Sequence, residues 1–143
     1  MNKEDKLKKS ARRGSIREGL FASASNAFGM SYLSPFAIAI NASSSVVALL
    51  SSVSGILGPL SQMFGSKFIG KYPRKKIVMA GVLLESIMWL PFIAIAILFY
   101  LNMLTKVLPL FILLTFAFFV ISGSFAVPAW FSWMGDITEE KHR

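Results

Sequence analysis

The chain of 143 residues is 55% hydrophobic and only 15% charged, with a mean hydropathy of +0.62 and a net charge of +8. This balance excludes an ordinary soluble domain and predicts a membrane protein. The chain has no cysteine and a single histidine, His142, so it offers no residue cluster for a metal and no set typical of an enzyme. We therefore expect no cofactor, no metal site and no enzymatic activity.

The N-terminal segment, residues 1–14, is polar and basic and is predicted to be a flexible cytosolic leader. Ser15 and Glu18 have the S-x-x-E spacing of a capping box, so we predict that the first helix begins there. The apolar pattern that follows is longer than the ~7–15 residues of a signal-peptide core. The segment is therefore not read as a secretory signal.

The rest of the chain predicts an all-α fold with a four-helix transmembrane domain over residues 15–135 and a cytosolic tail over 136–143. Each predicted span reaches the ~20 residues that cross the hydrocarbon core of a bilayer. Short connections make neighbouring spans antiparallel, and Pro35 and Pro91 are expected to bend the first and third spans. The predicted spans cover residues 16–41, 45–70, 76–101 and 107–134.

Basic residues are distributed unevenly between the two sides of these spans. Of the 15 lysines and arginines, only Lys106 falls on the side opposite the N-terminus. The positive-inside rule then predicts a multi-pass protein of the plasma membrane with both termini in the cytoplasm. The cluster KLKKSARR, residues 6–13, predicts contact with anionic lipid at that face, and the lack of a nucleic-acid module excludes nucleic acid as the expected partner.

The second predicted span is rich in small residues at a spacing of four. Such pairs let the backbones of neighbouring helices approach closely in lipid. We therefore predict that this span is a packed, interior helix. The pairs are Ser51 with Gly55, Ser54 with Gly58, Ser61 with Gly65, and Ser66 with Gly70.

The segment "GSKFIGKYPRKK", residues 65–76, lies between the second and third spans and resembles a signature of the major facilitator superfamily of transporters. That signature has the form G-x-x-x-D-(R/K)-x-G-(R/K)-(R/K), and Lys71, Arg74 and Lys75 match its basic positions. Ser66, Gly70 and Pro73 depart from its first glycine, its acid and its second glycine. "GDITEEKHR", residues 135–143, resembles the family's connection after its fourth helix.

The resemblance implies secondary active transport of a small molecule by alternating access, with this chain as the N-terminal part of the transporter. It covers about four of the family's usual twelve helices, so we expect a fragment that needs further C-terminal helices or an oligomeric partner. It also implies a cytoplasmic gate in which basic residues of the first inner loop pair with acids after the fourth helix. The gating candidates are Lys71, Arg74, Lys75, Asp136, Glu139 and Glu140, and their other interpretation is a simple topology signal.

Four polar residues inside the predicted spans lie at similar depth: Asn26, Glu85, Ser122 and Ser124. Glu85 is interpreted either as a proton-coupling acid or as a neutral side chain hydrogen-bonded to serines of the second span. Asn26 is a candidate for substrate contact or for an interhelical hydrogen bond, and the two serines for a site or a packing face. The resemblance implies a cavity lined mainly by the first and fourth helices.

A second function class stays open at this point. A chain with the same spans and the same charge asymmetry is also expected for a membrane scaffold or assembly subunit that transports nothing.

Overall fold

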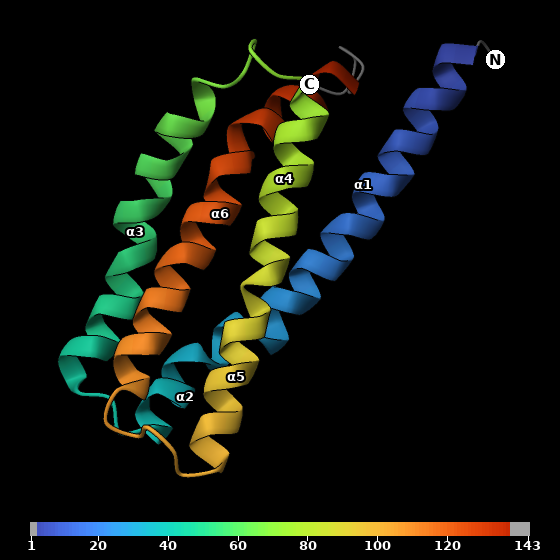
Figure 1. Cartoon of the computed structure of the whole chain (residues 1–143). Helices are drawn as coiled ribbons and strands as arrows, with labels where there is room; N and C mark the ends of the chain where they lie inside the picture. Colours follow the sequence, from blue (N-terminus) through green and yellow to red (C-terminus); the bar gives the residue numbers. More distant parts are fainter. Residues whose placement is uncertain (1–2, 138–143) are drawn as a thin grey trace.

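The computed structural model describes residues 3–137, and this range contains helices and turns but no β-strand (Figure 1). The all-α prediction is therefore confirmed. The elements are α1 (Lys3–Phe28), the 3-10 helix η1 (Met30–Tyr32), α2 (Leu33–Ala39), α3 (Ser44–Ser66), α4 (Arg74–Ile87), α5 (Trp89–Tyr100) and α6 (Leu108–Ile137).

Three helical segments of the described chain are long and apolar enough to cross a membrane, which indicates a multi-pass membrane protein. They correspond to the second, third and fourth predicted spans. Successive spans run in opposite directions, and the α3–α4 connection lies at the same end of the molecule as the start of α1 and the end of α6 (Figure 1). The segments are Ser44–Ser66, Arg74–Tyr100, which joins α4 and α5, and Leu108–Gly135.

The first predicted span differs from the structure at both ends. The helix begins at Lys3 and continues through Ser15 and Glu18, so the expected capping box does not start it and residues 3–14 are helical. Lysine, leucine, alanine and arginine in this segment are good helix formers, which explains the early start. The apolar run is then divided between α1 and α2, and neither is a candidate span by length and composition.

Two helix breaks precede the prolines that were expected to bend the first and third spans. α1 ends before Gly29, and Pro35 lies in the first turn of α2. α4 ends before Met88, and Pro91 lies in the first turn of α5. Proline is tolerated in a first turn because the missing N–H has no intrahelical partner there, whereas in a helix interior it removes a hydrogen bond.

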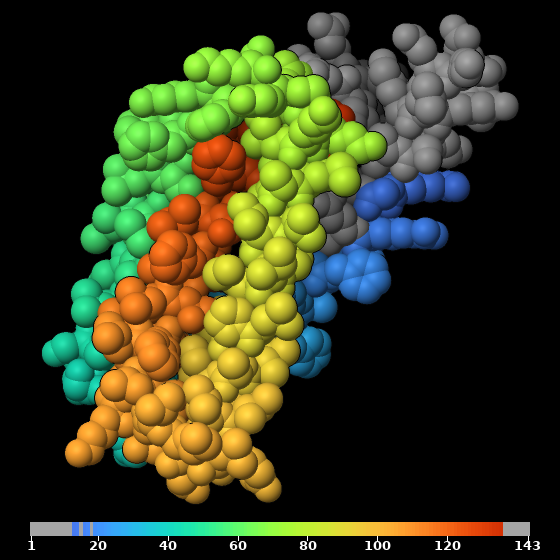
Figure 2. All heavy atoms as spheres, in the orientation of Figure 1, coloured from blue at the N-terminus to red at the C-terminus, as the bar shows by residue number. Residues whose placement is uncertain are grey.

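The central helix of the bundle is α6. It lies between α3 and α4, and its side chains are visible between those of the two helices in the space-filling view (Figure 2). On the α3 side, Ser61 is 5% exposed and its Oγ donates a hydrogen bond of 2.7 Å to the Ile121 carbonyl oxygen. The interior position predicted for the second span therefore belongs to α6, and α3 packs on it along one stripe.

The glycines of α3 fall into two groups. A Cβ at Gly65 would collide with the Phe125 backbone, and one at Gly58 would lie 3.5 Å from the Ser124 Oγ, so both glycines face α6. A Cβ at Gly55 would meet nothing within 4 Å, and that glycine has no packing role in the described structure.

Gly70, the fourth glycine predicted for packing, lies in the turn after α3. It also has no neighbour within 4 Å of an added Cβ, and its φ is +95°. This left-handed backbone conformation favours glycine because a Cβ would be strained there. Glycine is therefore favoured at position 70 by the conformation of the turn and not by helix packing.

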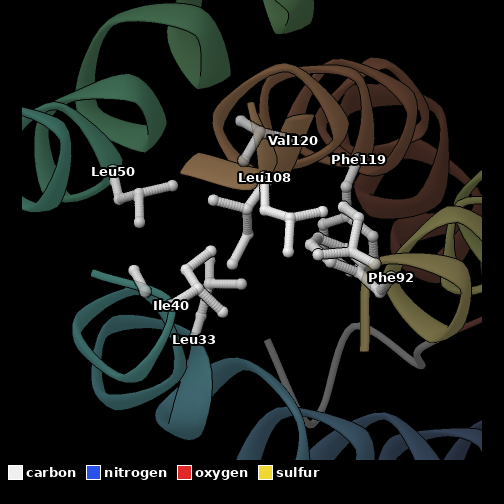
Figure 3. Packing of buried hydrophobic residues seen from close by; sticks show 10 residues of the cluster. Leu33, Ile40, Leu50, Phe92, Leu108, Phe119 and Val120 are labelled. Carbon is white, nitrogen blue, oxygen red and sulfur yellow. The ribbon is translucent and has the colours of Figure 1, made fainter. Parts of the chain in front are cut away.

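Buried apolar side chains form two clusters at opposite ends of the bundle. The larger gathers residues of α2, α3, α5 and α6, including Ile40, Leu50, Phe92 and Leu108 (Figure 3). The smaller joins α4 to the C-terminal part of α6 through Ile77, Val78 and Ala129. The polar residues discussed next lie between them.

Candidate functional site

The interface between α4 and α6 depends on small residues opposite each other. A Cβ at Gly81 would lie 2.5 Å from the Ala126 Cβ and 3.2 Å from the Ser122 carbonyl oxygen. One turn further along α4, the Glu85 carboxyl group packs over Gly123, where a Cβ would come within 2.9 Å of Cδ and 3.0 Å of each carboxylate oxygen. Gly123 therefore provides the space that the carboxyl group occupies.

The same carboxyl group lines a pocket of about 350 Å³ between α1 and the α4–α6 pair. α1 contributes Asn26 and Ser25 to this pocket, so the structure brings together two of the predicted polar residues, Asn26 and Glu85. Aromatic side chains complete the lining: Phe21, Trp89 and Phe119. We refer to this space as the Glu85 pocket.

The polar groups of the Glu85 pocket are incompletely paired. Among the described residues, none forms a hydrogen bond or ion pair with the Glu85 carboxyl group. Ser86 donates its hydroxyl proton to the Val82 carbonyl oxygen at 2.8 Å, within its own helix. A carboxyl group at this depth is unfavourable unless it is protonated, paired or hydrated. The pocket is therefore suited to a ligand, a proton or water beside Glu85.

The two predicted serines of α6 do not line this pocket. Ser122 donates to the Phe118 carbonyl oxygen at 2.8 Å within α6, and Ser124 faces Gly58 of α3. The similar depth of the four predicted residues was not enough, because they lie on different helix faces. Glu85 packs on α6 beside α1, so the expected hydrogen bonds to serines of the second span do not occur among the described residues.

The predicted cytoplasmic gate is described only on its basic side. Lys71 and Lys75 are exposed, whereas Arg74 is half-buried and its Nη1 lies 3.5 Å from the Ser132 carbonyl oxygen of α6. A cation is favourable near carbonyl groups of the last turns of a helix. Asp136 is in the last turn of α6, but its side chain lies outside the described residues, as do Glu139 and Glu140.

One contact of the site was not predicted from the sequence. Trp89, the first residue of α5, packs against Gly29, where an added Cβ would collide with the indole ring. The two helix breaks therefore meet beside the Glu85 pocket. Helical spacing could have assigned Trp89 to the pocket, because it follows Glu85 by four residues and so lies on the same helix face, but it gives no signal for the contact with Gly29.

Comparison of the chain with protein-family models, with curated proteins and with solved structures gave no match. The resemblance to the major facilitator superfamily therefore stays a prediction from the sequence.

Proposed function

We propose that this chain is the N-terminal part of a secondary transporter that moves a small molecule across the plasma membrane by alternating access. The observation that carries the proposal is the Glu85 pocket, in which a half-buried carboxyl group with no partner among the described residues lies on an apolar helical segment. Ionisable residues at membrane depth are rare and mark substrate, ion or proton pathways. The pocket volume of about 350 Å³ lies within the range of small-molecule sites.

Alternating access requires one side of the pocket to move relative to the other. α1 diverges from the bundle toward its N-terminus, and apart from its contact with η1 it packs only lightly on the described part of the bundle, chiefly on α6 (Figure 1). The breaks at Gly29 and Met88 give the first and third predicted spans a point at which they can bend. These features support α1 as the moving side and the α3–α4–α6 bundle as the fixed side.

We further propose that Arg74 acts at a cytoplasmic gate and that the exposed lysines around it contact anionic lipid. The contact of Arg74 with the Ser132 carbonyl oxygen favours this arginine over Lys75, which is exposed. Arg74→Gln and Lys75→Gln remove the same charge from the same loop. Only the first is expected to change the transport rate, while both variants insert normally.

The test is uptake into sealed proteoliposomes that contain the protein expressed from its complete reading frame. The solutes are a panel of organic cations, organic anions, sugars and amino acids, each measured against liposomes without protein. We expect saturable uptake of one class, lost in Glu85→Gln and retained in Ser122→Ala, because Ser122 does not line the pocket. Normal membrane abundance with no uptake of any solute would contradict transport and favour a scaffold.

A further inference from the structure

We propose that the Glu85 pocket binds an organic cation, namely a protonated or quaternary amine that carries an apolar or aromatic group. The inference rests on the proposed function only for the claim that the bound cation is then transported.

The charge of the pocket is one-sided. Among the described residues, Glu85 is the only ionisable side chain in its lining, and no lysine, arginine or histidine is found there. No described residue neutralises the carboxyl group through an ion pair or a hydrogen bond. A half-buried carboxylate favours a partner of opposite charge, and a bound anion would be repelled. A cationic ligand would therefore supply the positive charge that no described residue places beside the Glu85 carboxyl group.

Three aromatic side chains line the pocket together with the Glu85 carboxyl group. Phe21 comes from α1, Trp89 from the start of α5 and Phe119 from α6, and all three line the pocket with Glu85. The rings of Trp89 and Phe119 are edge to face, with centroids 5.9 Å apart and planes at 80°. Aromatic groups set at an angle to each other are typical of sites that bind ammonium ions through their ring faces.

The remaining lining favours an amphiphilic cation over a metal ion or a proton alone. Asn26 adds an amide at the pocket edge, and Val82 with the aromatic rings provides an apolar surface for the rest of the ligand. Oxygen ligands for a hard metal ion are too few, because Glu85 is the only carboxylate among the described residues of the lining. A volume of about 350 Å³ is also much larger than a proton carrier requires.

The test uses Trp89 as the reporter. Trp130→Phe and Trp133→Phe leave Trp89 as the only tryptophan, since the chain has three. The full chain in lipid nanodiscs is titrated with three cations, benzyltrimethylammonium, benzylammonium and tetraethylammonium, while Trp89 fluorescence is followed. Phenylacetate and N-benzylacetamide serve as the anionic and neutral probes of similar size. We expect a saturable change with at least one benzyl cation and a weaker one, or none, with the other two probes.

Three further variants localise the binding. Glu85→Gln is expected to weaken cation affinity at least roughly tenfold, because the attraction between the carboxylate and the cation is lost, and to leave the affinity for the neutral probe unchanged. Phe21→Leu is expected to weaken it by about 2- to 30-fold through the loss of one ring face. Phe118→Leu is the matched control, since Phe118 is also exposed but does not line the pocket. The Phe21 and Phe118 pair keeps the test valid if Glu85→Gln fails to fold.

The proposal would be overturned if none of the three cations bound, or if cation and neutral probes bound equally in the wild type and in Glu85→Gln. Its failure is distinguishable from the failure of transport. Cation binding in nanodiscs without any uptake in proteoliposomes would contradict the transporter and retain the site. Uptake of an anion or a sugar without cation binding would retain the transporter and reject the cation.

Discussion

Replacement of Gly65 by alanine is expected to separate α3 from α6. The new Cβ would collide with the Phe125 carbonyl oxygen and lie 3.1 Å from its carbonyl carbon, both backbone atoms that cannot rotate away. To restore normal contact distances, the helices must move apart locally by about 0.5–1 Å. Overpacking of this kind costs about 1–3 kcal/mol, and the higher helix propensity of alanine returns about 1 kcal/mol. The net destabilisation is therefore about 0–2 kcal/mol.

Gly55→Ala is the matched control on the same helix. An added Cβ meets nothing within 4 Å, so only the gain in helix propensity remains, up to about 1 kcal/mol of stabilisation. The free energy of unfolding of both variants is measured in mixed micelles by titration with sodium dodecyl sulfate and followed by circular dichroism. Because the gain in helix propensity is common to both variants, they should differ by the overpacking cost alone, about 1–3 kcal/mol. A Gly65→Ala variant as stable as Gly55→Ala would refute the close approach of α3 and α6.

Two further predictions concern the same bundle. Ser61→Ala should lower the free energy of unfolding by about 1 kcal/mol, because the hydrogen bond from Ser61 to the Ile121 carbonyl oxygen joins α3 to α6. Ser52→Ala is the control and should change the free energy of unfolding little, because it removes only a hydrogen bond within α3. A single cysteine at Lys75 should be protected from an impermeant thiol reagent outside intact cells while one at Asn102 is labelled, and the reverse pattern would invert the predicted topology.

Hydropathy was sufficient to predict the three apolar segments because their length and composition are set by the bilayer. The start of α1 was not predictable from its capping box, since the basic residues before Ser15 are themselves good helix formers and extend the helix. The break at Gly29 also depends on a distant residue. The Trp89 ring occupies the space that a side chain at position 29 would need, and no local pattern indicates that contact.

The packing glycines show a similar limit. The four-residue spacing predicted helix packing for four glycines, Gly55, Gly58, Gly65 and Gly70. Of these, only Gly58 and Gly65, which lie seven residues apart on one face, contact α6. Which face of a helix is covered depends on the position of its neighbour. The central place of α6 was missed for the same reason, because its small residues face two different helices.

The candidate site was predicted in part. Depth along the spans identified Asn26 and Glu85, and the fold brings both into one pocket. Depth could not separate them from Ser122 and Ser124, because helix rotation decides which residues at one level face each other.

The juxtaposition of α1 with α4 around the Glu85 pocket is the central claim, and cross-linking tests it most directly. The chain has no cysteine, so Ser25→Cys and Ser86→Cys form a unique pair across the pocket. Membranes are treated with a short bismethanethiosulfonate, and intramolecular products are identified by mass spectrometry. The control pair is Ser25→Cys with Ser52→Cys, an exposed position on α3. We expect efficient cross-linking of Ser25 with Ser86 only. Equal yields for the two pairs, or none across the pocket, would contradict the site on which the proposed function depends.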